Sequence, residues 1–341
     1  MPYRVVVGPA PPALGDLPAL LEAQGCDVKR LPAEAEAWTK DMIRDFAADA
    51  QALVGTFANS KLPRFVMEAA PNLRVIVSPI IGTEHIDVAA ATDLGIAVGY
   101  GATPENILGV AEAVVMLIAV WRKGFMAKYE TVRTGGWRAL QPGHMVRGST
   151  VGLIGFGNIG RAVAKRLAGW ECDVIACDPY IDGSEAPPLG VSMVDLDRLL
   201  ATSDTVVLLV TLTDETWHMI GAEQLAKMKP SAFLINVARG GVVDEAALVG
   251  ALDDNRLSGA AIDTWEQEPS PLLNPLRAHP RVIVTGHNIG HSDEAYASLP
   301  AAAVANTMRG LEGQPPLHFR NPEVIEKWRT RLRRLGVNSG S

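Results

Sequence analysis

The sequence predicts an α/β protein made of two doubly wound domains, each built on a parallel sheet. Three observations lead to this fold class. Short apolar runs of strand length recur along the chain, helix-length segments separate them, and a glycine-rich turn joins a strand to a helix near the middle. At 341 residues the chain is about two domains long.

The expected strands fall into two groups. The first group is residues 3–7, 28–31, 52–55, 73–77 and 96–99, with helical patterns such as 14–24 and 86–94 between the strands. The second group is residues 151–154, 174–177, 205–210, 232–237, 258–262 and 282–285, with a helix expected at 161–170. Each group predicts one parallel sheet with helices on both faces.

A long apolar helix is expected at residues 105–130, after the sequence Gly-Ala-Thr-Pro that begins at Gly101. Its apolar residues lie on nearly all sides, which is typical of a helix between domains or subunits, and a homodimer is therefore expected. An Ala-rich helix at 293–313 is expected to return to the first domain. The domains are thus predicted as 1–101 with 293–341, and 102–292.

The strand at 151–154 runs into Gly155, Gly157 and Gly160, in the spacing Gly-x-Gly-x-x-Gly. In a dinucleotide-binding turn these glycines allow a tight turn, close approach of a pyrophosphate, and close helix–strand packing. Asn158 and Ile159 lie between the last two glycines, where the N–H groups of a helix start favour anions. The motif predicts a Rossmann domain.

Asp178 ends the next strand and is expected to select the cofactor. A carboxylate here accepts hydrogen bonds from the ribose hydroxyls and repels a 2′-phosphate. Its neighbours Cys177, Pro179 and Tyr180 offer no cation. The sequence therefore predicts NAD rather than NADP.

Composition narrows the class of protein. A formal net charge of −7 and few aromatic residues argue against a nucleic-acid partner. The basic run at 327–334 is interpreted as the solvated face of a terminal helix. Three cysteines lack metal-ligand spacing, no metal site is predicted, and the thiols are expected to be reduced in a cytoplasmic protein. The apolar stretch at 107–121 carries Glu112 and is short for a membrane span, so no membrane partner is expected.

Four polar residues follow strands of the second group. They are Arg239, Asp263, Glu268 and His287. Because ligands of open α/β sheets bind beyond the carboxyl ends of the strands, one cation, two acids and an imidazole are expected to meet beside the dinucleotide.

With these motifs the chain resembles the NAD-dependent D-2-hydroxyacid dehydrogenases, the family of D-lactate, D-glycerate and D-3-phosphoglycerate dehydrogenases. The resemblance rests on residues 82–90, 110–112, 236–244 and 263–269, the glycine motif and the His287 segment. It covers nearly the whole chain. It implies a flavodoxin-like substrate domain beside the Rossmann domain, and hydride transfer between NAD(H) and a D-2-hydroxyacid or 2-oxoacid.

The resemblance also implies roles for single residues. Arg239 would hold the carboxylate and carbonyl of the substrate, His287 would exchange the proton, and Glu268 would pair with His287. Asp263 and Ala238 would contact the cofactor. The substrate would lie against Phe57, Ile80, Ile81 and Gly82, and no metal ion takes part.

Departures from the family leave the substrate open. Pro79 and Ile80 stand where relatives often carry small or polar residues, and Ile289 stands where they often carry Gly or Ala. Phe57, Pro79 and Ile80 favour an apolar or aromatic side chain on the substrate over a phosphorylated one, with Lys61 and Arg64 as the contrary signal. His291 is a rival of His287 for the proton.

Two other functions remain open. Formate dehydrogenases share the fold, and Asn106 falls where they carry a substrate-binding asparagine, but they have Gln where this chain has Glu268. The C-terminal-binding corepressors, NAD-responsive scaffolds, also resemble the family; this sequence shows no tail for partner docking after the core.

Overall fold

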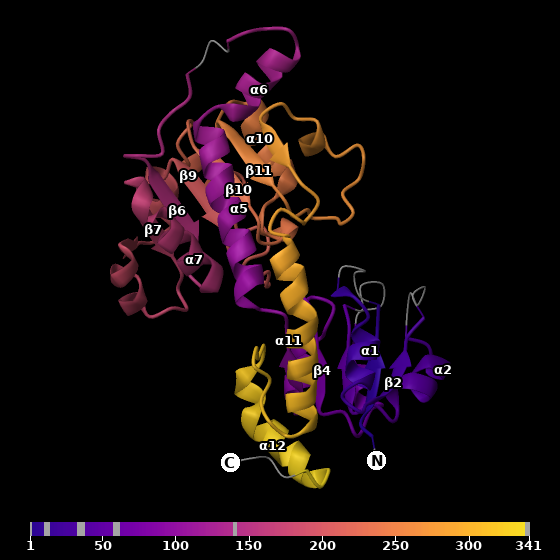
Figure 1. The fold of residues 1–341 in the computed structure, drawn as a ribbon. Helices are drawn as coiled ribbons and strands as arrows, with labels where there is room; N and C mark the ends of the chain where they lie inside the picture. The colour runs from indigo at the N-terminus through magenta and orange to yellow at the C-terminus, as the bar shows by residue number, and fades with distance from the viewer. Residues whose placement is uncertain (1, 10–13, 33–37, 57–61, 139–141, 338–341) are drawn as a thin grey trace. The chain divides into compact units, whose positions relative to one another are not determined.

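The computed structural model describes residues 2–9, 14–32, 38–56, 62–138 and 142–337 (Figure 1). The chain divides into two compact units. Unit 1 comprises Met1–Asn106 and Ser292–Ser341, and unit 2 comprises Ile107–His291. The expected boundaries at residues 101 and 293 lie a few residues from these points.

Unit 1 holds a parallel five-stranded sheet in the order β2-β1-β3-β4-β5. Its strands are β1 Arg4–Val7, β2 Asp27–Arg30, β3 Ala52–Val54, β4 Val75–Val77 and β5 Ala97–Gly99. Its helices are α1 Leu17–Glu22, α2 Lys40–Met42 continued as a π-helix at Ile43–Ala47, α3 Arg64–Glu68, α4 Val88–Asp93, α11 Asp293–Leu311 and α12 Ile325–Arg334, which follows a 3-10 turn at Pro322–Val324. The strand order is the flavodoxin-like one.

Successive residues of the unit 1 strands pack into two different cores, because side chains alternate across a sheet. Val6, Leu53 and Ile76 face α3 and α4. Val5, Val7, Val75 and Val77 face α1, α11 and α12. The helix expected at 293–313 thus covers the sheet formed by the first hundred residues.

The basic run on α12 corrects an expectation, because Arg331 is buried rather than solvated. Its guanidinium donates to the carbonyl oxygens of Leu73, Ala70, Pro71 and Leu94 at 2.6–3.1 Å. Burial, with a smaller effect of the neighbouring Arg334, lowers the pKa of Arg331 to about 10. The side chain is therefore hydrogen-bonded to backbone carbonyl groups within unit 1.

Unit 2 holds a parallel seven-stranded sheet in the order β12-β11-β10-β9-β6-β7-β8. Its strands are β6 Thr150–Ile154, β7 Asp173–Cys177, β8 Val191–Met193, β9 Thr205–Leu208, β10 Phe233–Asn236, β11 Gly259–Ile262 and β12 Val282–Val284. Its helices are α5 Pro104–Arg122, which begins in unit 1, α6 Phe125–Arg133, α7 Asn158–Leu167, α8 Leu196–Thr202, α9 Ala222–Lys227 and α10 Glu245–Asp253. Short 3-10 turns lie at Ala168–Trp170, Gly183–Glu185, Pro187–Leu189, Gly240–Val242 and Pro275–Arg277.

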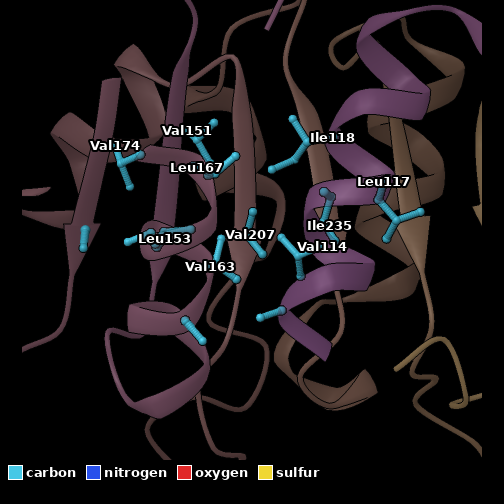
Figure 2. Packing of buried hydrophobic residues seen from close by; sticks show 14 of the residues in the cluster. Val114, Leu117, Ile118, Val151, Leu153, Val163, Leu167, Val174, Val207 and Ile235 are labelled. Atoms are coloured by element: carbon cyan, nitrogen blue, oxygen red, sulfur yellow. The ribbon is translucent and has the colours of Figure 1, made fainter. Parts of the chain in front are cut away.

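Helices cover both faces of this sheet. Figure 2 shows α5 and α7 packing Val114, Leu117 and Leu167 against the strand residues Leu153 and Val207. On the other face, residues of α8, α9 and α10 such as Leu199, Leu225 and Leu248 form a second core. The expected doubly wound fold is confirmed in both units.

The helix expected at 105–130 is two helices. Gly124 adopts the left-handed conformation (φ +59°) between α5 and α6 and ends the first helix. Part of its apolar surface is uncovered in the single chain, since Met116 is 48% exposed, and the expectation that it lies between domains or subunits stays a prediction. The short strand β8 was not expected, because residues 191–193 show no long apolar run.

α5 is the one described helix that is long and apolar enough to span a membrane, with a mean hydropathy of 1.5. The same composition suits the core helix of a soluble protein. Val114, Leu117 and Ile118 of α5 are buried in the core of unit 2. α5 therefore has one side buried in this core and one side exposed in the single chain.

Candidate active site

The glycine turn follows β6, which lies between β7 and β9 in the sheet. Gly155 has φ +98°, and a Cβ there would lie 2.8 Å from the carbonyl of Leu209. A Cβ on Gly160 would lie 2.6 Å from the carbonyl oxygen of Gly155. These two positions therefore accept only glycine, as expected for a dinucleotide turn.

The third glycine faces open space. A Cβ on Gly157 would meet no described atom within 4 Å. Gly157 caps α7 without a side-chain hydrogen bond, and Asn158, Ile159 and Gly160 form the first turn of that helix. The arrangement fits the pyrophosphate of a dinucleotide, which would lie against the N–H groups at the start of a ten-residue helix.

Asp178 is half-buried directly after β7 and reaches back to the glycine turn. Its Oδ2 accepts from the N–H of Phe156 at 2.9 Å, and its Oδ1 accepts from the N–H of Tyr180 at 3.0 Å. Each carboxylate oxygen can accept a further bond. Asp178 is thus fixed in orientation and keeps the capacity to accept ribose hydroxyls.

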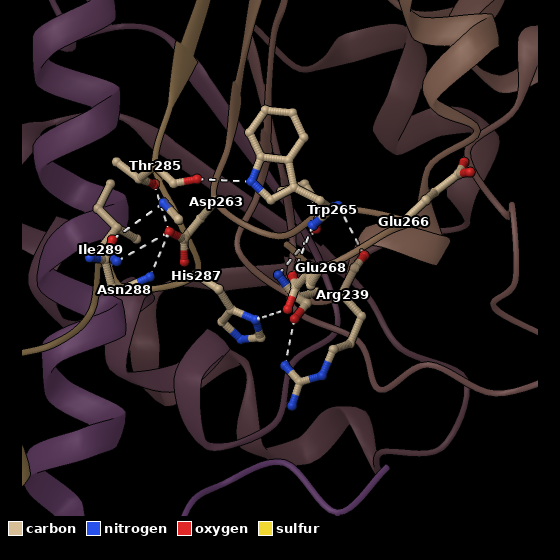
Figure 3. A network of polar contacts seen from close by, with 12 residues as sticks. Arg239, Asp263, Trp265, Glu266, Glu268, Thr285, His287, Asn288 and Ile289 are labelled. Carbon is tan, nitrogen blue, oxygen red and sulfur yellow. Dashed lines mark hydrogen bonds and ion pairs between the residues drawn. The ribbon is translucent and has the colours of Figure 1, made fainter. Parts of the chain in front are cut away.

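Glu268 and His287 form a close pair in unit 2 (Figure 3). His287 Nδ1 and Glu268 Oε2 are 2.8 Å apart. The other oxygen of Glu268 accepts from the N–H of Trp265 at 3.0 Å. A cavity of about 640 Å³ is lined by both members of the pair, together with Thr285 and Arg277. The pair therefore has a fixed geometry and open space beside it.

The pKa of Glu268 is lowered from its usual value. Burial raises it, but the hydrogen bonds from His287 and Trp265 and the positive charges of His287 and Arg239 together outweigh burial. Glu268 is therefore an anion at neutral pH.

Asp263 holds the turn that carries His287. Its carbonyl accepts from the N–H of His287 at 2.7 Å. Its Oδ1 accepts from the hydroxyl of Thr285 at 2.6 Å and from the N–H groups of Asn288 and Ile289 at 3.0 and 3.1 Å. His287 has φ +57°, a backbone conformation that residues other than glycine adopt rarely. The four hydrogen bonds keep it there.

Arg239 follows β10 and directly precedes the 3-10 turn Gly240–Val242. Its Nη1 donates to the carbonyl oxygen of Ala238 at 2.6 Å, and its own carbonyl accepts from Nδ2 of Asn236 at 3.0 Å. Ala238 is buried. Figure 3 shows the guanidinium beside the His287 ring, below Glu268. The structure thus brings together all four polar residues that the strand ends predicted.

His291, the rival histidine, is in a different environment. Burial lowers the pKa of His291, and the nearby charge of His287 adds to this shift while Asp263 opposes it. A neutral imidazole at this position is poorly suited to donate a proton at neutral pH.

The predicted substrate loop lies in unit 1. Ser78, at the end of β4, donates to the carbonyl oxygens of Ile80 at 3.1 Å and Gly82 at 2.6 Å, which fixes the loop. Ile80 and Ile81 are half-exposed, whereas Pro79 is buried and offers no surface to a ligand. Phe57 and Lys61 lie outside the described residues.

Sequence reasoning missed several residues around the pair. Thr285 and Trp265 support Asp263 and Glu268, and a Thr directly before Gly-His at a strand end is a signal that could have suggested the first. A second histidine–carboxylate pair, His218 with Glu266 at 2.9 Å, carries no sequence signal, since its members lie far apart in the chain. Within the described ranges, no group of three or more His, Cys, Asp or Glu could hold a metal ion.

The chain is similar to several known proteins. Residues 114–288 match the family model described as D-isomer specific 2-hydroxyacid dehydrogenase, NAD binding domain. The chain is 37% identical over 312 residues to a glyoxylate reductase of Thermofilum pendens, covering 88% of this chain and 90% of that one. It is 38% identical over 271 residues to a D-3-phosphoglycerate dehydrogenase of Archaeoglobus fulgidus, covering 79% of this chain and 51% of that one.

A solved structure gives the same result. The crystal structure of a glyoxylate reductase from Paecilomyes thermophila superposes with a TM-score of 0.82 at 26% identity, covering 95% of this chain and 99% of the other.

The geometry at Asp178 predicts cofactor preference. We expect Asp178→Ala to weaken NADH binding by about 1–3 kcal/mol and to relax discrimination against NADPH, because hydrogen bonds to a charged group are lost. Asp178→Asn should relax discrimination too while keeping one acceptor for the turn. Titration of both cofactors by protein fluorescence measures this, with Asp182→Asn, an exposed acid nearby, as the control. Equal affinity of the unmutated protein for NADPH would contradict the prediction.

Proposed function

This chain belongs to the D-isomer specific 2-hydroxyacid dehydrogenase family, and from this premise we propose that it interconverts a 2-oxoacid and its D-2-hydroxyacid. NAD is the cofactor, and NADH supplies the hydride when bound. The observation that carries the proposal is the hydrogen-bonded Glu268–His287 pair, held in a constrained turn beside the cation of Arg239.

Each residue of this site has a chemical task. The fork of Arg239 matches the carboxylate and carbonyl of a planar 2-oxoacid. His287 gives its proton to the carbonyl oxygen as the carbonyl carbon accepts the hydride, and takes the proton back in the reverse reaction. Glu268 stabilises the imidazolium.

The cofactor site would lie at the carboxyl ends of β6, β7, β10 and β11. Gly155, Gly157, Asn158, Ile159 and Gly160 would hold the pyrophosphate, and Asp178 the ribose. Asp263 and Ala238 would complete the site near the reacting atoms. This assignment is supported by the open space at Gly157 and by the acceptor capacity of Asp178.

The loop at Ile80, Ile81 and Gly82 would receive the substrate's carboxylate and side chain. We propose an apolar side chain rather than a phosphorylated one. Ile80 and Ile81 are half-exposed. Arg64, a cation that could bind phosphate, is paired with Asp93 at 2.8 Å and Glu68 at 3.7 Å.

The alternatives are less well supported. The acid Glu268 next to His287 disfavours formate oxidation. Asn106 is the residue that suggested formate oxidation. Its Nδ2 donates to the carbonyl oxygen of Gly101 at 3.4 Å, so this side chain is hydrogen-bonded to the backbone. A scaffold function would not require the acid/base pair that this chain retains.

Steady-state kinetics with a panel of 2-oxoacids tests the proposal. We expect NADH oxidation with oxoacids that carry apolar or aromatic side chains, and His287→Ala should lower kcat by about 10²–10⁴-fold. Arg239→Ala should raise KM steeply, because it removes ground-state binding of the carboxylate. Best activity with 3-phosphohydroxypyruvate would overturn the substrate proposal. Loss of turnover in His291→Ala but not His287→Ala would move the proton to His291.

The charge of Glu268 should be visible in the pH profile of oxoacid reduction. Reduction requires protonated His287, so activity falls as pH rises through its deprotonation. Removing the carboxylate charge in Glu268→Gln destabilises the imidazolium, and this alkaline limb should therefore move to lower pH. A limb that stays in place would show that Glu268 does not stabilise the charge.

We also propose a homodimer built on α5 and α6. Apolar side chains on these helices are exposed in the single chain: Met116, Phe125, Met126, Tyr129 and Val132. Several exposed apolar side chains on neighbouring helices favour an interface, and two-fold pairing is the commonest way to cover them.

Light scattering at micromolar concentration should therefore return twice the 36.3 kDa chain mass. Phe125→Glu combined with Val132→Glu should shift the mass towards the monomer, because charges would be buried at the interface. Lys227→Glu, on the surface of α9, is the control. A monomer mass for the unmutated protein would refute the dimer.

A further inference from the structure

We propose that His218 and Glu266 are positioning residues that fix the distance between the Arg239 turn and the segment carrying Glu268. The inference rests on the proposed function, because it assigns Arg239 to the substrate. Neither residue touches the Glu268–His287 pair, and Figure 3 shows Glu266 pointing away from His287.

The Arg239 turn is pressed between two segments of unit 2. On one side, a Cβ added to Gly240 would overlap the backbone of Trp265. On the other side, a Cβ added to Gly241 would overlap the indole ring of Trp217. The turn can therefore shift only if one of these two segments moves.

The segment at Trp217 is itself bonded to the turn. The N–H of His218 donates to the carbonyl oxygen of Gly241 at 2.7 Å, and the N–H of Ile220 donates to that of Val242 at 3.1 Å. The rings of Trp217 and His218 stack, with centroids 4.5 Å apart. His218 has φ +50°, so its backbone is held in a conformation that is unfavourable for a side chain of this kind.

The His218–Glu266 pair joins this segment to the other one. His218 Nε2 and Glu266 Oε1 are 2.9 Å apart, and the same oxygen accepts from the N–H of Glu245 at 3.0 Å. The N–H of Glu266 donates back to Oε1 of Glu245 at 2.8 Å. Glu266 is thereby fixed to the start of α10, two residues before Glu268 in the chain.

The effect expected of this link is on distance rather than on stability. The side chains of His218 and Glu266 are about a third exposed (34% and 31%), and such pairs contribute little to folding. A bidentate contact to a small oxoacid, in contrast, is sensitive to small displacements of the guanidinium. Loss of the link should therefore weaken oxoacid binding more than it affects the fold.

The test compares KM for the best 2-oxoacid of the panel in four variants. His218→Ala and Glu266→Ala should each raise KM about 3- to 10-fold, the size expected for one lost hydrogen bond. The affinity for NADH and the Tm should stay near the wild-type values. His218→Gln and Glu266→Gln keep a hydrogen-bonding group at the same reach and should restore KM.

Two further measurements separate positioning from a general structural effect. The double variant His218→Ala/Glu266→Ala should be no worse than Glu266→Ala, since that single variant already removes the link to His218. Lys227→Ala breaks the exposed ion pair with Asp197 on α8 and α9 (2.8 Å), away from the Arg239 turn, and should leave KM unchanged. If His218→Ala fails to fold, Glu266→Ala carries the same test.

An unchanged KM in both alanine variants, with an active wild type, would overturn the inference and leave the proposed function standing. So would additive effects in the double variant. A wild type that reduces no 2-oxoacid would overturn the proposed function, and the inference with it.

Discussion

Parallel pairing of β6, β9, β10, β11 and β12 places their carboxyl ends at one edge of a single sheet, and the candidate site of unit 2 depends on this constraint. The glycine turn, Arg239, Asp263 and the His287 turn each follow one of these strands. The last residues of β10, β11 and β12 (Asn236, Ile262 and Val284) are paired with one another, so the segments that carry these groups start from the same edge. The loops that follow the strands then set the orientation of each side chain.

These orientations are held largely by hydrogen bonds to backbone groups. Asp263 receives four bonds in all, three of them on one carboxylate oxygen, and these hold His287 in a backbone conformation that costs about 1–3 kcal/mol when unsupported. Glu268 is oriented by one N–H and one ring nitrogen. The reactive groups are thus arranged before any ligand arrives, which is the condition for electrostatic stabilisation of a developing charge.

The sequence predicted the recurring strands and the polar residues that follow their carboxyl ends. Apolar runs located the strands that carry Asp178, Asp263 and His287, because burial on both faces leaves a clear pattern. The sequence did not predict the features that depend on contacts between distant parts of the chain. Gly124, in a left-handed conformation, divides the helix expected at 105–130 into two. Arg331 is buried against carbonyl groups more than 230 residues away in the chain. His218 and Glu266 contact each other only in the folded chain. Periodicity gives no sign of such contacts. Phe57, assigned to the substrate, lies outside the described residues.

The division of unit 1 into two chain segments has a consequence for biosynthesis. One face of its sheet, with Val5, Val7, Val75 and Val77, is covered in part by Ala303, Leu311, Trp328 and Leu332. On the ribosome those residues appear only after all of unit 2, residues 107–291, has been made. Until then, this face of the nascent first segment lacks the part of its cover that the second segment supplies. Chaperones that shield apolar surface during translation should matter more for this chain than for a protein whose domains follow one another in order.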